Sequence, residues 1–533
     1  MAKGFAVFDC VSECPMDKKR EISRRNLFVA FVGVAGAAVI GKFLIAGKNG
    51  VAKVKALISS PKVEGMPNTI KGELIDWKAR SKAAYGVLFN FEATGPNMPV
   101  IWDDTERRHI NETMFALPAY LGDYRQNPER MGSHESLSGI GAVLGASLYG
   151  LDMSNHNGRN FTHELLGYFQ GNGVAKVVTN QTADSGSQSS FWYLLYPNIA
   201  FYAVNSLYLD EPGFKEASVE IADSLLDMME NLKTIDGKFS FNFPGYNFLI
   251  KSPTYGGSNE PDAAAGTAWI LYMAYLRFGD EKYFTGARKA LDYLDLLTDD
   301  ENPFYEVLLA FGVTIAARMN LEKGTDYNYD KYFAWIFEVF SSARSGWGIV
   351  SDTWGMYHVH GLQGSTVDSG GYAFAFNSYN CLAALAPLPI YAPEYTQVIG
   401  KWLFNSAVSA RLFYPDQLPA DNQTQPEVIG LYDNGLAYEG LRKEWAFKFP
   451  VATADARRMT WAVTDIGIYG SGLVGVLAGL ISSVEPNGII VFEISKTDFF
   501  PTTPTPRFLA YNSSETTQTY KDHSLESGES VLI

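Results

Sequence analysis

Hydrophobic residues recur at helical spacing over most of the chain between about residues 69 and 484. In residues 264–278 the apolar side chains repeat every three or four positions, and residues 283–294 do the same after a turn at 278–280. Apolar residues at this spacing form one face of a helix, and a short turn between two such helices makes an antiparallel helical hairpin. The pattern therefore predicts a hairpin over 264–294.

Three further hairpins and several single helices are predicted in the same way. The hairpins pair residues 191–209 with 214–232, 303–320 with 329–342, and 372–388 with 393–412. Single helices are expected at 70–91, 134–149, 438–447 and 461–481. Connections within hairpins are short, whereas the segments 239–262 and 343–371 between hairpins are long and rich in Gly, Asn, Trp and Tyr. Long loops of this kind carry function when they collect on one rim, so we expect the site there.

Both ends of the helical region have a different pattern. Residues 57–68 are rich in Ser, Pro and Lys, which is typical of a linker. The β-branched and aromatic run Gly488–Ile494 predicts a strand, followed by Pro- and Thr-rich turns and a second apolar run at Phe508–Asn512. We therefore expect a small β appendage with a polar tail over residues 485–533.

These hairpins, with alternating short and long connections and aromatic, Gly-rich loops, resemble the six-hairpin or α/α-toroid superfamily of carbohydrate-active enzymes. The resemblance covers residues 69–484 and implies an all-α fold, an α/α toroid of about six helical hairpins, with the β segment as a C-terminal companion. The superfamily includes glucanases, unsaturated glucuronyl hydrolases, mannanases and polysaccharide lyases, and the toroid also carries dehydratases and sugar epimerases. The resemblance implies a carbohydrate substrate, but no family motif is matched, so no catalytic residue is carried over from it.

The charge of the chain is unevenly distributed. Residues 1–56 have ten Lys or Arg against four Asp or Glu, whereas the whole chain has a net charge of −15. Residues 57–533 therefore carry a net charge of −21, six more negative than the whole chain. An acidic body repels the phosphates of nucleic acids, so no nucleic-acid partner is expected.

The basic N-terminal stretch precedes the uncharged run Asn26–Gly41, which is the arrangement of an export signal. Residues 23–28 (SRRNLF) resemble the twin-arginine signal, with the order of Leu and Phe reversed. The run is short for a membrane span, so a cleaved signal and a retained anchor both stay open. We expect a periplasmic, cell-surface or extracellular protein that contacts a membrane only through residues 1–56.

The cysteines and histidines do not predict a metal site. Cys10 and Cys14 precede the export signal, and Cys381 is alone in the rest of the chain, so no disulfide and no cysteine-based zinc site is expected there. His358 and His360 share one face of an extended segment, but the sequence has no H-E-x-x-H motif to complete a metal site. We expect no metal and no cofactor.

Carboxylates in the long loops are the candidate catalytic groups. Glycoside hydrolysis requires two carboxyl groups across a cleft, one protonated and one ionised. The candidates are Glu260, Asp262, Asp368 and Asp104. Each has a structural alternative, since an acid next to a helix start caps the helix or interacts with its dipole. For the acids at 103–106, which adjoin two arginines, the alternative is a solvated, salt-bridged turn.

Other residues of the same loops suit substrate contact. His360 is a candidate acid or base near neutral pH, with the shaping of a turn as its structural alternative. Aromatic faces stack on sugar rings, and amide and imidazole groups bond to hydroxyls. The candidate binding residues are Trp102, Tyr255, Asn259, Trp354, Tyr357, His358 and Tyr372.

The sequence therefore predicts an exported glycoside hydrolase that cleaves an oligo- or polysaccharide by carboxylate acid/base catalysis. One alternative is a polysaccharide lyase, in which His360 or Tyr357 removes a proton next to a uronate carboxylate. The net charge of −21 over residues 57–533 disfavours such a polyanionic substrate. The other alternative is a surface protein that binds glycans without chemistry.

Overall fold

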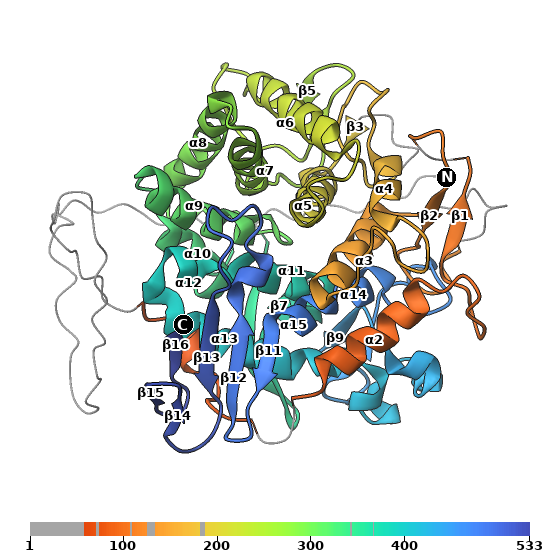
Figure 1. Ribbon diagram of the computed structural model, residues 1–533, viewed down its shortest axis with the longest axis vertical. Helices are drawn as coiled ribbons and strands as arrows, with labels where there is room; N and C mark the ends of the chain where they lie inside the picture. Colours follow the sequence, from red (N-terminus) through yellow and green to blue (C-terminus); the bar gives the residue numbers. More distant parts are fainter. Residues whose placement is uncertain are drawn as a thin grey trace, which may run out of the picture. The chain divides into compact units, whose positions relative to one another are not determined.

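The computed structural model describes residues 58–70, 74–106, 109–124, 134–181, 187–341, 344–365 and 367–533. The predicted hairpins are confirmed, with small shifts at their ends (Figure 1). They are α5 (Phe191–Leu207) with α6 (Phe214–Asn231), α7 (Ala263–Phe278) with α8 (Glu281–Leu296), α9 (Leu308–Lys323) with α10 (Tyr329–Phe337), and α11 (Ala375–Leu385) with α12 (Leu388–Tyr391) and α13 (Thr396–Ser409). The helices α2 (Trp77–Leu88), α3 (Ser136–Tyr149) and α4 (Phe161–Glu164) precede them.

The helices form an inner ring and an outer layer. Around the ring, α3, α5, α7, α9 and α11 each pack on the next, and α14 (Ile468–Gly472) packs on both α11 and α3. Side chains of α5 and α7 are buried on almost every side, whereas α6 and α8 bury one stripe and lie outside them (Figure 1). A helix that is apolar all round belongs inside, and an amphipathic one outside. This arrangement is consistent with an α/α toroid.

The expectation of an all-α fold is too narrow, because strands lie within the helical part. The segment expected as a loop at 343–371 contains β6 (Gly348–Trp354) and β7 (Tyr357–Gly364), and the expected helix at 438–447 is replaced by β9 (Gly440–Arg442) and a loop. With β8 (Tyr372–Phe374) and β10 (Val451–Thr453) they form an antiparallel sheet of order β10-β9-β8-β7-β6. Smaller sheets join β1 (Trp102–Asp104) to β2 (Met114–Ala116), and β3 (Ser187–Gln188) to β4 (Tyr246–Asn247) and β5 (Ser252–Pro253).

The C-terminal strand predictions are confirmed. The strands β11 (Ile481–Val484), β12 (Ile489–Glu493), β13 (Phe508–Asn512) and β16 (Ser530–Leu532) form one sheet, and β14 (Gln518–Tyr520) pairs with β15 (His523–Leu525). The four-stranded sheet packs on α13, where Phe404 stacks on Tyr511 at 5.0 Å between ring centres. The buried Arg318 of α9 forms an ion pair with Asp498 at 3.2 Å. These contacts hold residues 485–533 in the same compact unit as the helices.

The segment expected as a linker is folded over its described residues. Pro61–Glu64 form α1, and the side chain of Ser60 accepts a hydrogen bond from Val63 N. The side chains of Val63 and Met66 are buried, and Asn405 of α13 donates to the carbonyl of Pro67. Burial of these apolar side chains, rather than the Ser- and Pro-rich composition, determines that the segment is folded.

The expected export signal or anchor at residues 1–56 lies outside the described residues. Within the described part of the chain, every helix is too short or too polar to cross a bilayer.

The ring of inner helices closes through glycines. The expected helix 461–481 divides into α14 and α15 (Gly475–Leu480), which contact α3. A Cβ at Gly475 would overlap the carbonyl oxygen of Gly145 in α3, and a Cβ at Gly145 would overlap that of Gly472. The hydroxyl of Tyr85 donates to Gly472 O at 2.9 Å and accepts from Gly475 N at 2.9 Å. A side chain inserted into the helical hydrogen bonds in this way breaks the helix at that point.

We predict that Gly475→Ala lowers the free energy of unfolding by at least ~2 kcal/mol, because backbone atoms cannot yield to the added methyl group. Gly86→Ala is the matched control, since Gly86 lies in α2 with open space around it. This control is expected to raise the free energy of unfolding by about 0.5–1 kcal/mol. Denaturant unfolding of both variants measures the two values, and equal stability of the two would contradict close contact at the ring closure.

Candidate functional site

The N-terminal ends of the inner helices meet at one end of the ring. Glu260, two residues before Asp262 at the start of α7, accepts a hydrogen bond from Trp192 N in the first turn of α5. Asp262 accepts from Tyr305 N, just before α9. Glu306 accepts from the Asn377 side chain in the first turn of α11. Because each bond joins the start of one inner helix to the start of the next, the loops before these helices converge.

Glu260, Asp262 and Glu306 form what we call the acidic cluster. Glu260 accepts from Ser190 Oγ at 2.8 Å and Trp192 N at 2.7 Å, yet burial raises its pKa to about 7. Asp262 is fully buried, and burial followed by the neighbouring charge of Glu260 raises its pKa well above the usual range. Burial also raises the pKa of Glu306 to about 8, against the effect of its 2.6 Å bond from Asn377. Burial therefore favours the protonated form of each acid, and Glu306, with a pKa of about 8, keeps its proton at neutral pH.

Arg344 supplies positive charge to the acidic cluster. Its guanidinium lies 3.5 Å from the centre of the Tyr305 ring and donates to Asn259 O at 2.8 Å. The charge of Arg344 acts to lower the pKa of all three acids, although burial outweighs it. The guanidinium thus limits the cost of burying three carboxyl groups together.

Glu306 is the member of the acidic cluster with the most access to solvent and a strained backbone. Its side chain is only partly buried, whereas those of Glu260 and Asp262 are almost completely buried. Its φ of 53° lies in the left-handed region, which is uncommon for a residue other than glycine. Gln363 of β7 donates to the Glu306 carbonyl, and Cys381 Sγ donates to Gln363 Oε1 at 2.6 Å. Strain held by such contacts is typical of functional positions.

Glu439 is a further buried carboxylate, held by tyrosines. It accepts hydrogen bonds from the hydroxyls of Tyr120 at 2.5 Å, Tyr469 at 2.5 Å and Tyr372 at 2.8 Å, and from Asp455 N at 3.1 Å. Burial raises the pKa of Glu439, and the four donors oppose this effect by stabilising the ionised carboxylate. Glu439 therefore has the hydrogen-bonding environment of an anion, unlike Glu306.

The acidic cluster and Glu439 adjoin the same strand–helix junction. Tyr372 of β8 donates to Glu439, and Asn377 of α11 donates to Glu306. The backbone N–H of Ala375, the first residue of α11, also donates to Glu439 O, so both glutamates lie at the N-terminal end of this helix. Phe376 lies between the two groups, 5.3 Å from Tyr469 and 5.9 Å from Trp192 between ring centres.

Besides Asp262 Oδ1 of the acidic cluster, several polar atoms of this region are buried without a hydrogen bond to any described residue. They include Trp192 Nε1, Trp347 Nε1 and Asn377 Oδ1. Trp347 packs edge-on against Tyr305 with 5.3 Å between ring centres, and Tyr305 lies beside Arg344. Buried polar atoms of proteins are rarely unpaired, so these donors and this acceptor are suited to a polar ligand.

The structure brings together some of the predicted site residues. Glu260 and Asp262 share the acidic cluster, and Tyr372 binds Glu439. Asn259 is exposed, and its carbonyl accepts from Arg344. Asp262 caps no backbone group of its own helix α7 with its side chain, so that structural alternative is not observed.

Asp368 lies at the edge of the Glu439 group. It is exposed and has a φ of 53°, and its carboxylate lies 2.7 Å from Arg442 Nε. Arg442 lies 3.9 Å from Asp455, whose backbone donates to Glu439. The helix α11 begins at Ala375 without a side-chain cap, so Asp368 does not cap it.

The two predicted histidines have their contacts elsewhere, on β7 beside α13. His360 Nδ1 lies 3.2 Å from Ser351 Oγ of β6, and His360 N donates to Ser409 Oγ of α13. Burial and then the charge of His358 lower the pKa of His360 to about 4. The two imidazole rings lie 5.6 Å apart between centres. No described contact joins either ring to the acidic cluster or to Glu439.

The remaining predicted residues are spread over three places. Asp104 lies 2.7 Å from His134 Nε2, whose Nδ1 bonds to Tyr168, and the Trp102 ring packs edge-on against His134. Trp354 is buried and donates to Asp352, and Tyr357 is half-buried in β7. Tyr255 is exposed and packs against Phe243 at 5.9 Å between ring centres.

Glu306 and Arg344 are not among the residues predicted from the sequence, and Glu439 was expected only as part of a helix at 438–447. Glu306 stands just before an apolar helix, as Glu260 and Asp262 do, and this repeated position was a usable signal. Nothing in the local sequence marks Arg344 or the tyrosines of Glu439, since their partners are distant in the chain.

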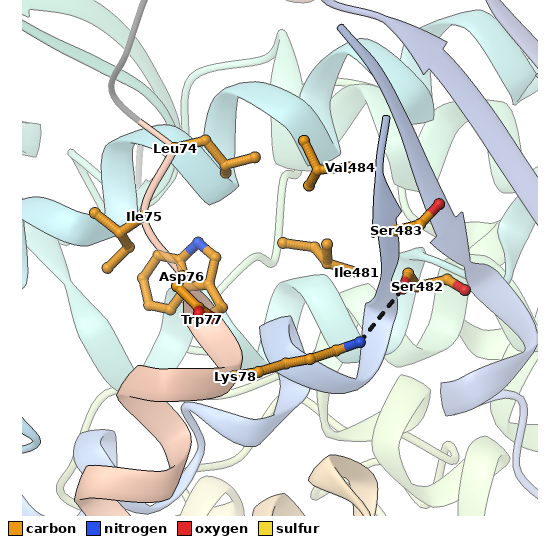
Figure 2. Close-up of a pocket in the computed structure, with 9 residues that line it drawn as sticks. All are labelled: Leu74, Ile75, Asp76, Trp77, Lys78, Ile481, Ser482, Ser483 and Val484. Atoms are coloured by element: carbon orange, nitrogen blue, oxygen red, sulfur yellow. Dashed lines mark hydrogen bonds between the residues drawn. The ribbon is translucent and has the colours of Figure 1, made fainter. Parts of the chain in front are cut away.

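Elsewhere, a groove of about 380 Å³ lies between the residues before α2 and strand β11 (Figure 2). Its lining is mainly apolar, with Leu74, Ile75, Ile481 and Val484, and Lys78 Nζ donates to Ser482 O across it. It has no grouping of acids or histidines, so catalysis is not assigned to it. No three His, Cys, Asp or Glu residues in the described ranges have the geometry of a metal site.

Comparison with known proteins yields distant structural similarity only. No protein-family model and no curated protein matches the chain. An unsaturated glucuronyl hydrolase mutant from Streptococcus agalactiae is 13% identical, with 79% of this chain and 95% of that chain covered and a TM-score of 0.38. A sugar epimerase from a ruminal bacterium is 10% identical, with 75% and 98% covered and a TM-score of 0.42. A glycosidase variant is 12% identical, with 77% and 98% covered and a TM-score of 0.25. Such similarities do not assign an activity to this chain.

We predict that stability falls as pH rises through the acidic cluster's titration. A carboxyl whose pKa is raised on folding stabilises the native state below its unfolded pKa, and this stabilisation is lost as pH rises through the folded value. For Glu306 the window runs from its usual 4.5 to about 8. Glu306→Gln removes the titrating group, so the loss of stability between pH 5 and pH 8 should shrink by roughly 1–3 kcal/mol.

Denaturant unfolding at both pH values measures this difference. The matched control is Glu230→Gln, because Glu230 is exposed and its pKa is lowered by Lys289. The control should keep the pH dependence of the unmodified protein between pH 5 and pH 8. An unchanged pH dependence in Glu306→Gln would show that Glu306 is ionised at neutral pH.

Proposed function

We propose that this protein is an exported α/α-toroid glycoside hydrolase that cleaves an oligo- or polysaccharide. The general acid is Glu306, and its ionised partner is Glu439. Glu260 and Asp262, which the sequence pointed to, have positioning roles. The charge of Glu260 helps to raise the pKa of Glu306, and Asp262 accepts a hydrogen bond from Tyr305 N, next to Glu306. Export rests on the basic and uncharged pattern of residues 1–56.

The observation that supports this proposal is a pair of buried glutamates with different hydrogen-bonding environments at one end of the ring. Burial raises the pKa of Glu306 to about 8, so it holds a proton at neutral pH. Four hydrogen-bond donors surround Glu439 and favour its anion. A pair of carboxyl groups whose environments separate their protonation states is the arrangement of an acid and its base or nucleophile.

Each of these residues has its own role in hydrolysis. Glu306 donates its proton to the glycosidic oxygen as the bond between that oxygen and the anomeric carbon breaks. Glu439 either deprotonates a water that attacks the anomeric carbon or attacks that carbon itself. In the second case water, deprotonated by Glu306, then attacks the anomeric carbon and releases the Glu439 carboxylate. The separation of the two carboxyl groups in the substrate complex decides between these outcomes. Asn377 orients Glu306, and Tyr120, Tyr372 and Tyr469 orient Glu439.

The lyase alternative has less support from the geometry. Proton abstraction requires a basic group near the acids, and burial and hydrogen bonding to Glu439 raise the pKa of Tyr372 well above 10, so it keeps its proton. His360 is bonded to Ser351, away from both carboxylate groups. A lyase also needs a uronate, and the acidic body disfavours a polyanion.

We predict that Glu306→Gln and Glu439→Gln each lower kcat about 10²–10⁴-fold, because each removes one member of the acid/base pair. Reducing-end release from a panel of neutral oligosaccharides measures the rate, and Glu230→Gln should keep the unmodified rate. Above pH 8 the activity of the unmodified protein should fall as Glu306 loses its proton.

Each alternative gives a distinct result in the same assay. Full activity after both substitutions would reject the assigned pair. A product that absorbs as an unsaturated uronate would establish a lyase. Glycan binding without product from any member of the panel would favour a non-catalytic binding protein.

A further inference from the structure

A polar cavity of about 700 Å³, here called the rim pocket, lies beside the acidic cluster. Its walls come from the loop before α7, the end of α8 and the segment after it, and Arg344. The lining residues are Ser240, Asn242, Ser258, Asn259, Pro261, Tyr293, Leu297, Asp300, Glu301, Asn302, Pro303 and Arg344.

One backbone segment separates the rim pocket from the acidic cluster. Asn259 and Pro261 line the pocket, while the alternate residues Glu260 and Asp262 belong to the cluster. The segment turns into α7 at this point, where Ala263 N donates to Glu260 O. A ligand in the rim pocket therefore lies against the other face of the segment that carries two of the acids.

Arg344 belongs to both places. It lines the rim pocket, and its charge acts on the pKa of all three acids of the cluster. Its hydrogen bonds to described residues, to the carbonyls of Ser258 and Asn259, both come from Nη2. Since a guanidinium carries five N–H donors, Nε and Nη1 retain donors for a ligand.

The chemistry of the lining selects a neutral, hydroxyl-rich ligand. Amide, hydroxyl, carboxylate and guanidinium groups line the pocket, and together they donate to and accept from hydroxyl groups. Asp300 and Glu301 outweigh the single charge of Arg344, so an anionic ligand is disfavoured. The volume lies within the range of small-molecule sites.

We infer that the rim pocket is a glycan subsite that binds neutral sugar units of the substrate on the side of the acidic cluster. This inference rests on the proposed function. It identifies the substrate as a neutral glycan that extends beyond the sugar units at the cleaved bond. Binding to the rim pocket is separable from turnover, since Asn242 and Asp300 line the pocket without contacting Glu306 or Glu439.

The experiment measures binding by calorimetry on the full chain carrying Glu306→Gln, so that turnover does not interfere. The probes are cellotetraose, maltotetraose, mannotetraose and xylotetraose, with tetragalacturonate as the anionic comparison. In this background, Asn242→Ala with Asp300→Ala should weaken binding of the neutral tetrasaccharide at least tenfold. A second variant, Ser258→Trp, fills the pocket from an exposed position and should do the same.

The matched control carries Asn155→Ala with Asp210→Ala, which are exposed residues outside the rim pocket and should leave Kd unchanged. Thermal unfolding of every variant shows that the fold is kept. Less than a twofold change in both pocket variants, failure of every neutral probe to bind, or tighter binding of tetragalacturonate would each overturn the inference. Lack of product from the unmodified protein would instead reject the proposed function, and tetrasaccharide binding in the rim pocket would still stand.

Discussion

The close contact of α3 with α14 and α15 is the constraint on which the rest of the structure depends. Gly145, Gly472 and Gly475 let the backbones of the first and last inner helices touch, and Tyr85 satisfies the backbone groups freed where α14 ends. With the ring closed, the loops before the inner helices meet at one end. Residues as distant in sequence as Tyr120, Tyr372, Glu439 and Tyr469 thereby become neighbours.

Burial and helix ends then determine the chemistry of the converging acids. The first backbone N–H groups of a helix have no partner within it, and they favour a nearby carboxylate. Glu260 meets this need at the start of α5, and its burial still raises its pKa to about 7. The Glu260 side chain therefore both caps the start of α5 and has a raised pKa. Glu306 and Glu439 differ in their hydrogen bonds, because few donors lie around Glu306 and four lie around Glu439.

Prediction from sequence succeeded where the signal is local. The apolar spacing of α5 to α11 located the hairpins, and the long loop 239–262 led to Glu260 and Asp262, which the structure brings together. It failed for β6, β7 and β9, whose short runs become strands only because they pair with one another. The sequence predicted His358 and His360 of β7 as site residues. In the structure the register of β7 against β6 places His360 opposite Ser351, with which it is hydrogen-bonded.

The sequence by itself determined the position and order of four helical hairpins, the C-terminal strands and the acidic character of the body, because hydrophobic spacing and composition are properties of neighbouring residues. Only the tertiary structure decided which acids meet, which of them keep a proton, and that Arg344 and three tyrosines surround them. Protonation depends on burial and on partners that are distant in the chain. Closure of the ring creates both, so no local pattern of residues contains this information.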